Sequence, residues 1–235
     1  MSEKKRLVLF VEGTGDCAAA PVLINRMFRE RSDPPWDCLE VDDQPPFKVG
    51  EISGLMGRDK KTGGIEFQQW HKYLDRAGRT RNKLGGVLLL LDGDAERVAG
   101  QPFCPAVLGR LLAEESRKAG GGTLFSVGVV FLCAEFESLF LASRLTLPPL
   151  KANPEAFPPV IESKRGVKEW LKRNLREGYK NTEDQALLTQ TLSFEEIRPQ
   201  MSSFRRLERA LDELIQAIRS GQHIVSPRHP SSESP

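Results

Sequence analysis

Five carboxylates follow three short apolar runs of this chain, and they are the residues best suited to carry out chemistry. The run LVLFV leads into Glu12, the run VLLLL leads into Asp92 and Asp94, and the run VGVVFLC precedes Glu135 and Glu137. Carboxylates gathered in one place repel one another and raise each other's pKa, and a bound divalent cation removes that penalty. Hard oxygen ligands favour Mg²⁺ or Mn²⁺. These residue types therefore indicate a metal-dependent phosphoryl-transfer site.

The elements that must position these acids are predicted from the same runs. Short apolar runs bounded by turn residues are typical of buried strands in a parallel sheet. Strands are expected at 7–11, 36–41, 87–91 and 124–133, and helices at 21–31, 65–79 and 106–118. This alternation predicts an α/β fold, a parallel sheet flanked by helices. Because ligands of such sheets bind beyond the carboxyl ends of the strands, we expect the acids to converge in one crevice.

The second half of the chain lacks strong strand signals. Helices are expected at 135–144, 164–175, 184–192 and 203–219. We therefore expect an α/β domain at 1–145 and a C-terminal helical extension at 146–220 that packs on it. The tail 221–235 is poor in apolar residues and is expected to be disordered. The segment 42–64 is rich in Pro, Gly and charge and is expected to be a long loop.

The composition limits which binding partners and which cellular location we expect for the protein. The chain has 235 residues and a formal net charge of +2, so nucleic acid would be bound only through local segregation of charge. No apolar run approaches the roughly 20 residues of a membrane span, and the N-terminus does not resemble a signal peptide. We expect no membrane partner and a cytoplasmic location. The cysteines form no CxxC pair and are expected to be buried free thiols rather than zinc ligands: Cys17, Cys38, Cys104 and Cys133.

Each acidic motif also has a purely structural explanation. Asp92 and Asp94 are two residues apart, so they share one face of a strand and can reach one ion, although Asp-Gly is also a common turn. Glu135 and Glu137 begin a predicted helix, where the helix dipole favours acids. Asp16, which follows a Gly13-Thr14-Gly15 turn, and Glu96 are secondary metal-ligand candidates, with a solvated or helix-capping side chain as the alternative for each.

Basic residues of the second half are candidates for contact with a substrate. Arg165, Lys168, Arg205 and Arg206 are predicted to bind nucleic acid, and Lys164, or alternatively Arg165, is predicted to stabilise the transition state. The alternative for each is a solvated helix face, since Lys and Arg are routine there. If a cluster contacts phosphates, binding should weaken steeply with salt.

Taken together, these motifs resemble the Toprim domain of topoisomerases, primases and OLD-family nucleases. The matches are Glu12, which is followed by Gly13, and the pair Asp92 and Asp94. The chain also resembles a narrower Toprim-like group, domain of unknown function 4276, through LFVEGTGDCAAAPVLINRMF, LLLLDGDAE, AEFESLFLAS, GYKNTEDQALL and SSFRRLERAL.

The resemblance implies a Toprim/Rossmann-like sheet and metal binding by the three matched acids. It also singles out, without fixed roles, Glu135, Glu137, Asp184, Gln185, Ser203, Phe204 and Arg205. The chain departs from the pattern at Ser138-Leu139, where an Ala-Trp-like pair is expected.

Within the Toprim class, a nuclease that hydrolyses DNA or RNA is the function we expect. A topoisomerase needs a nucleophilic tyrosine and strand-handling domains, and this chain has only Tyr73 and Tyr179. A primase needs a polymerising partner domain. Two alternatives stay open: a non-catalytic metal- or nucleotide-binding module that docks on a partner ATPase, and a small-molecule phosphohydrolase. The resemblance implies a partner ATPase and a role in phage defence, and a homo-oligomer is left open.

Overall fold

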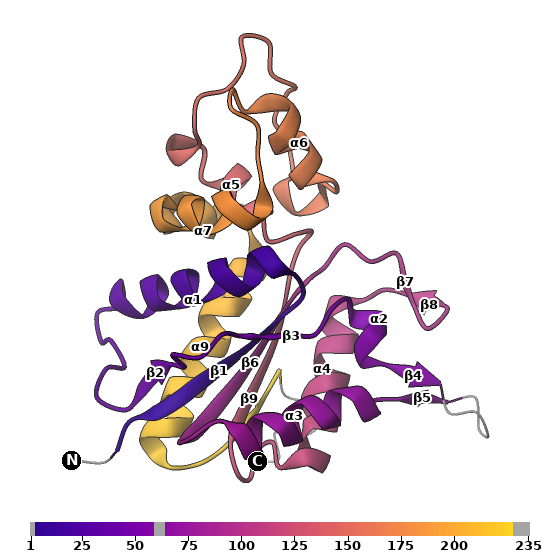
Figure 1. Ribbon diagram of the computed structural model, residues 1–235, viewed down its shortest axis with the longest axis vertical. Coiled ribbons are helices and arrows are strands. Elements are labelled where there is room, and N and C mark those ends of the chain that lie inside the picture. Colours follow the sequence, from indigo (N-terminus) through magenta and orange to yellow (C-terminus); the bar gives the residue numbers. More distant parts are fainter. Residues whose placement is uncertain (1–2, 59–63, 228–235) are drawn as a thin grey trace.

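A sheet of six strands forms the centre of the molecule (Figure 1). The computed structural model describes residues 3–58 and 64–227. The strand order is β10-β9-β6-β1-β2, and β3 also pairs with β1. The strands are β1 (Lys5–Val11), β2 (Leu39–Val41), β3 (Phe47–Lys48), β6 (Leu84–Asp92), β9 (Ser126–Leu132) and β10 (Val225–Ser226). All of their pairings are parallel, which confirms the predicted α/β fold.

Helices cover both faces of the sheet, which explains why its strands are apolar throughout. Leu7 and Leu9 face one layer, while Val8 and Phe10 face the other. The first layer contains α1 (Thr14–Arg29) and α9 (Ser202–Ser220). The second contains α3 (Gln68–Thr80) and α4 (Pro105–Ser116), on the opposite side of the sheet (Figure 1).

The register of the strands brings the carboxyl ends of β1, β6 and β9 to one edge of the sheet. Val11 of β1 pairs with Leu90 of β6, and Asp92 of β6 pairs with Leu132 of β9. Beyond this edge lie α5 (Ser138–Ala142), α6 (Val167–Asn174) and α7 (Asn181–Thr191), in the upper part of Figure 1. These helices therefore cap the end of the sheet where the acids were predicted.

Several elements differ from the sequence-based expectation. Helix α1 begins at Thr14, seven residues before the expected start, and contains Pro21 in its interior. Helix α8 (Phe194–Gln200), which begins after an N-cap at Ser193, was not predicted. Single-turn 3₁₀ helices occur at Arg117–Ala119, Arg144–Thr146 and Ile161–Ser163. A short hairpin, β7 (Arg97–Val98) and β8 (Gln101–Pro102), follows the Asp94 region.

The predicted loop at 42–64 contains more structure than its composition indicates. It holds β3, α2 (Ile52–Leu55) and β4 (Gly57–Arg58), and β4 pairs with β5 (Ile65–Glu66). Phe47 stacks on Phe10 of β1 with ring centroids 4.8 Å apart. These elements are too short to give a periodic sequence pattern, so packing on the sheet rather than local propensity forms them. Residues 59–63 lie outside the described residues.

The last part of the chain returns to the sheet. Helix α9 packs on β9, so it belongs to the same core as the N-terminal half. The expected disorder of the tail from residue 221 was wrong for β10, in which Val225 is buried and pairs with Val127. A strand of two residues, Val225 and Ser226, is too short to give a strand signal in the sequence. The rest of the predicted tail, 228–235, lies outside the described residues.

Two further expectations concern membrane segments and thiols. None of the helices in the described ranges is long and apolar enough to cross a membrane. All four cysteines are free thiols. Cys38 is buried as expected, whereas Cys17 and Cys133 are only partly buried and Cys104 is exposed.

Candidate functional site

Glu12 and Asp92 lie next to each other where β1 and β6 end. The backbone N–H of Asp92 donates a hydrogen bond of 3.4 Å to Oε2 of Glu12. Burial raises the pKa of Glu12 to about 7, the hydrogen bond from Asp92 opposes this, and the charges of Asp94 and Asp16 add to it. Glu12 and Asp92, which were predicted from separate apolar runs, are therefore in direct contact in the folded protein.

The Asp92 side chain is held between two elements beyond the sheet edge. Its Oδ1 accepts a hydrogen bond of 2.8 Å from the backbone N–H of Phe136, and its Oδ2 lies 3.8 Å from Nζ of Lys168. The residue is only 8% exposed, and burial followed by the charges of Asp16 and Glu12 raises the pKa of its carboxyl group well above the usual range. Ionisation of Asp92 is therefore unfavourable unless a cation offsets the charge.

Gly93 explains the spacing of the Asp92-Gly-Asp94 motif. Its N–H donates to the carbonyls of Leu132 at 2.7 Å and of Ala134 at 2.8 Å, which ties the end of β6 to the end of β9. A Cβ at this position would lie 2.9 Å from Sγ of Cys133 and 3.0 Å from the Leu132 carbonyl oxygen, so a side chain does not fit. Asp94 follows this tight contact and is half-buried, within the electrostatic reach of Glu12.

Glu137 brings a further buried carboxyl group to the same region. Its Oε1 accepts a hydrogen bond of 3.0 Å from the Tyr179 hydroxyl, and its Oε2 lies 3.8 Å from Nζ of Lys168. This Oε2 atom has no hydrogen-bond partner within the described part of the chain. The residue is fully buried, and that burial raises its pKa to about 7.

Lys168 is the cationic residue of this cluster. Burial alone would lower the pKa of its amine, but the carboxylates of Glu137 and Asp92 outweigh burial and raise it. The sequence indicated Lys168 for nucleic-acid binding and Lys164 for catalysis, yet the structure places Lys168 among the acids. The spacing of residues along the chain does not predict this position of Lys168, because a tertiary contact determines where α6 begins.

Glu135 provides that contact. Its carboxylate accepts backbone N–H groups from Gly166 at 2.6 Å and from Val167 and Lys168 at 3.3 Å each. The first N–H groups of a helix lack partners within the helix and favour an anion. Glu135 therefore caps α6, a helix distant in sequence, rather than the helix that it was predicted to begin. It fixes the backbone from which Lys168 extends.

Asp16 is likewise engaged by structural contacts. Its Oδ2 accepts a hydrogen bond of 2.7 Å from the backbone N–H of Gly13, and its Oδ1 accepts one of 2.7 Å from Nε2 of Gln185. The first bond caps α1 and the second joins α1 to α7. Asp16 is buried, so it contributes negative charge to the cluster while both of its oxygens already have donors.

The donor chemistry of this cluster fits a hard divalent cation, although its arrangement is not a ready ligand set. Carboxylate oxygens of Glu12, Asp92, Asp94 and Glu137 are the type that Mg²⁺ and Mn²⁺ prefer. Among the residues that the structure describes, however, no three Asp, Glu, His or Cys side chains are grouped closely enough to hold a metal ion. Asp92 and Glu137 already have partners in the Phe136 N–H, the Tyr179 hydroxyl and Lys168, so metal binding requires these side chains to exchange those contacts for the ion.

A family model matches most of this chain. The model of a domain of unknown function, DUF4276, covers residues 11–212, which include every acid of the cluster and the helices that cap it. The chain belongs to the DUF4276 family. Comparisons of this DUF4276 protein with curated proteins and with solved structures gave no match.

The other predicted basic residues of this DUF4276 protein have contacts of their own. Arg165 pairs with exposed Glu96 at 2.9 Å, and Arg205 donates to the backbone carbonyl of Arg198. Arg206 lies 3.9 Å from Sγ of Cys133, which follows the end of β9. Lys164 makes no ion pair with these acids within the described ranges. Nucleic-acid binding by these residues stays a prediction.

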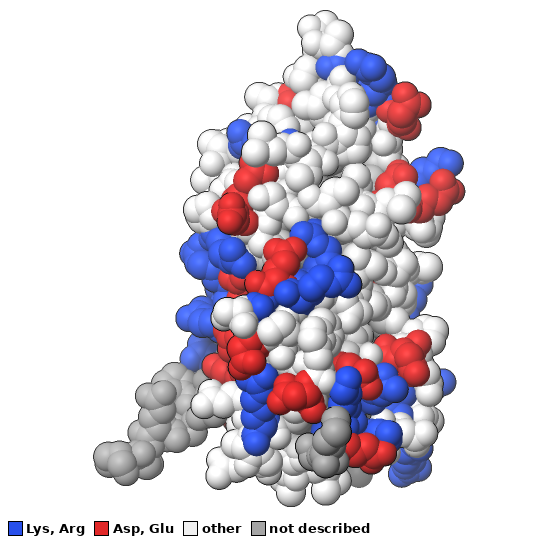
Figure 2. Space-filling model, turned by 90° about the vertical axis from the view of Figure 1, so that its left-hand side faces the viewer, with Lys and Arg blue, Asp and Glu red and all other residues white. Residues whose placement is uncertain are grey.

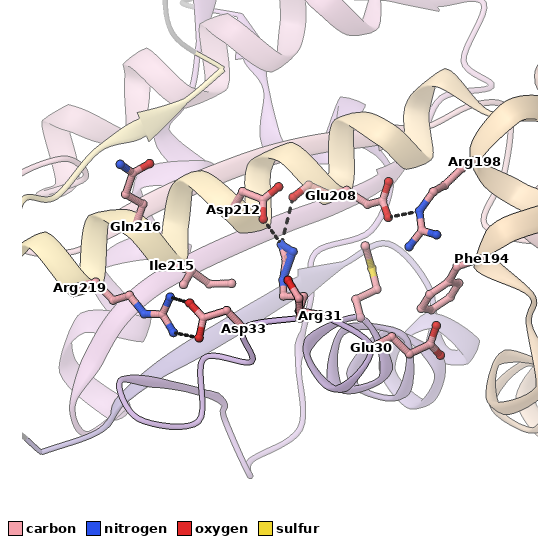
Figure 3. A pocket seen from close by; sticks show the side chains of 12 residues that line it. Glu30, Arg31, Asp33, Phe194, Arg198, Glu208, Asp212, Ile215, Gln216 and Arg219 are labelled. Atoms are coloured by element: carbon pink, nitrogen blue, oxygen red, sulfur yellow. Dashed lines mark hydrogen bonds and ion pairs between the residues drawn. The ribbon is translucent and has the colours of Figure 1, made fainter.

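A cavity of about 510 Å³ between α1 and α9 lies apart from the acids (Figure 3). Charged side chains that line it form ion pairs with one another: Arg31 pairs with Asp212 at 2.6 Å and Arg198 pairs with Glu208 at 2.8 Å. On this side of the molecule, Figure 2 shows positive and negative side chains interleaved. The first pair joins the turn after α1 to α9, the second joins α8 to α9, and both occupy charges that a ligand would need.

Proposed function

We propose that this DUF4276 protein is a divalent-cation-dependent phosphodiester hydrolase that acts on DNA or RNA, as its resemblance to Toprim domains implies. The observation that supports the proposal is the hydrogen bond of 3.4 Å between the Asp92 N–H and Glu12, which puts the two motifs at one sheet edge. Glu12, Asp92 and Asp94 would hold Mg²⁺ or Mn²⁺. When bound, the ion would neutralise charge on the phosphate and make a water molecule more acidic.

Lys168 has the second role in this proposal. Its ammonium group stands 3.8 Å from both Asp92 and Glu137, where it offsets part of their charge. With the charge of the acids offset by a bound ion, the Lys168 amine would be free to donate to a phosphate oxygen, a contact that stabilises the negative charge of a phosphoryl transition state. Glu135 and Tyr179 would act as positioning residues for Lys168 and Glu137.

A non-catalytic module is the second candidate, and one observation favours it. Lys168 already supplies a positive charge among the acids, and the described acids are not grouped for a metal ion. In that case the cluster would be structural, and the protein would act by docking on a partner. Both candidate functions are compatible with the partner ATPase and the role in phage defence that the resemblance implies.

A cleavage assay with matched variants separates these functions. The purified full chain is incubated with Mg²⁺ or Mn²⁺ and single- or double-stranded DNA, RNA or a small phosphodiester. Glu12→Gln and Asp92→Asn should lower cleavage by roughly 100-fold or more, the scale expected when an electrostatic catalytic group is lost. Glu96→Gln serves as the control, because Glu96 is exposed and pairs with Arg165 rather than with the acids of the cluster.

Three results would contradict the nuclease proposal. Full activity in both Glu12→Gln and Asp92→Asn would exclude the acidic cluster as the active site. Hydrolysis of the small phosphodiester alone would indicate a small-molecule phosphohydrolase. Binding of metal without cleavage of any substrate, also in the presence of an ATPase encoded beside the protein, would favour the non-catalytic module.

A further inference from the structure

Helix α3 carries a row of basic side chains on the face that points away from the sheet. Lys72, Arg76 and Arg79 are exposed, and together with one acid, Asp75, they line a hollow of about 290 Å³. Residues three or four positions apart lie one helical turn from each other, so the three cations form a row roughly 10 Å long. This row has an excess of positive charge.

The charges of this row are not offset by ion pairs. Its three cations pair with no carboxylate of the residues that the structure describes. The next basic residues along the chain differ, since Arg81 pairs with Asp42 at 3.2 Å and Lys83 pairs with Glu3 at 2.5 Å. A cation that already has a carboxylate partner has little charge to offer a second one. The row on α3 therefore keeps its charge available for a ligand.

Strand β3 connects the row on α3 to the sheet. Among the described strands, β3 pairs with β1 alone, so it forms an edge of the sheet. The Arg76 guanidinium lies over the ring of Phe47, 5.5 Å from its centroid, and the Tyr73 hydroxyl donates a hydrogen bond of 3.4 Å to the Lys48 carbonyl. These contacts hold α3 against β3 and restrict the Arg76 side chain.

Lys48 continues the positive charge from this edge to the acidic cluster. It pairs with Val11, the residue before Glu12. Paired residues of neighbouring strands face the same side, and Val11 faces the layer that contains α1. The exposed Lys48 amine accordingly donates a hydrogen bond of 2.9 Å to Oγ1 of Thr14, two residues beyond Glu12. Exposed cations thus extend from the outer face of α3, across β3, to the neighbourhood of Glu12.

We propose that Lys48 and the row Lys72, Arg76 and Arg79 bind the phosphate backbone of a nucleic acid and direct it across β3 toward Glu12. A phosphate backbone suits this surface, because it presents charges at regular intervals and needs no apolar pocket. An acidic peptide fits less well, since the hollow on α3 is lined by charged and polar side chains alone. The destination of the strand rests on the proposed function, whereas binding to these cations needs neither metal nor cleavage.

Fluorescence anisotropy of the full chain in EDTA tests the proposal without cleavage of the probe. The probe is a labelled thymidine oligonucleotide of about 20 residues, long enough to cover such a surface. Lys72→Gln/Arg79→Gln should weaken binding by at least about fivefold and reduce the slope of log K against log salt by about 1.4, because each phosphate contact of a single strand contributes about 0.7. Arg29→Gln/Lys151→Gln is the matched control, which removes two exposed charges elsewhere and should change neither quantity.

Two single variants test the sign of the charge effect and the direction of the path. Asp75→Asn removes the acid from the hollow and should strengthen binding by about twofold or more, a gain that a misfolded variant would not show. Lys48→Gln should weaken binding by about twofold or more, since it removes one phosphate contact.

The proposal is overturned by absence of oligonucleotide binding, by an unchanged salt slope in the α3 double variant, or by an equal loss in its control. Equally tight binding of polyglutamate, with the same dependence on the row, would overturn it in favour of an acidic peptide. Cleavage of nucleic acid without any dependence on the row would overturn it and leave the nuclease intact. Row-dependent binding without cleavage would support it and count against the nuclease.

Discussion

The Nζ atom of Lys168 lies 3.8 Å from Oδ2 of Asp92, so a residue of the capping helices supplies positive charge at the end of a central strand. The same nitrogen lies 3.8 Å from Oε2 of Glu137. Both carboxyl groups are buried, and a buried charge without a partner is strongly unfavourable. The contact therefore links the capping helices to the sheet and determines how the acidic cluster responds to substitution, pH and metal.

Lys168→Met is expected to lower both activity and stability, because it leaves the buried carboxyl groups of Asp92 and Glu137 without their cationic partner. Methionine retains much of the apolar stem but cannot donate to a phosphate, so kcat should fall by roughly tenfold or more, the scale of one lost electrostatic contact. Steady-state kinetics on the best substrate measure the change. Lys164→Met is the matched control and should retain near-normal kcat. If Lys164→Met is the impaired variant, the role of Lys168 is wrong and the sequence-based role of Lys164 is restored.

The stability of the metal-free protein should fall as pH rises from 5 to 8. Burial raises the pKa of Glu12 and of Glu137 to about 7, from a usual value of 4.5. Between these values the folded protein binds protons that the unfolded chain has released, so stability is present at low pH and lost as pH passes 7. Thermal melts measure the change, and Glu137→Gln should flatten it. A melting temperature that rises over this range would contradict the electrostatic account.

Magnesium should stabilise the protein more at pH 8 than at pH 5, because protons compete with the ion for the carboxylates. Melts at millimolar MgCl₂ and MnCl₂, compared with CaCl₂, test this expectation. Asp92→Asn should abolish the shift, whereas Glu96→Gln should leave it unchanged. Identical midpoints with and without metal at pH 8 would count against a metal site in this cluster.

Glu135→Ala should loosen the start of α6. Three backbone N–H groups lose their acceptor, which we expect to cost about 1–2 kcal/mol of unfolding free energy, the upper range for loss of a helix cap. Hydrogen exchange at residues 166–168 should become faster. Glu169→Ala, an exposed acid in the first turn of the same helix, is the control. Equal effects of both substitutions would refute the capping role.

Gly15→Ala should separate α1 from α7. A Cβ at Gly15 would lie 1.9 Å from Oε1 of Gln185 and 2.8 Å from the Asn181 carbonyl oxygen, so the helices must move apart and the Gln185–Asp16 bond is strained. We expect a loss of about 1–3 kcal/mol, typical of overpacking. Gly78→Ala in α3 meets no atom within 4 Å and should be neutral or stabilising. Urea unfolding of both variants gives the comparison.

The sequence by itself determined the sheet and its acidic edge. The apolar runs before Glu12 and Asp92 are long enough to specify buried parallel strands, and the fold rule for such sheets brings their ends together. The same local reasoning missed α8, the short elements within 42–64 and β10, because two to seven residues give too little periodicity.

Only the tertiary structure decided which residues accompany those acids. Glu135 caps α6, Asp16 bonds to Gln185, and Lys168 rather than Lys164 stands among the carboxylates. Each of these contacts joins segments that are distant in the sequence. Their partners are set by how the capping helices pack on the sheet edge, and spacing along the chain does not encode that packing. Strand ends are local properties of a sequence, whereas side-chain partners are properties of the assembled fold.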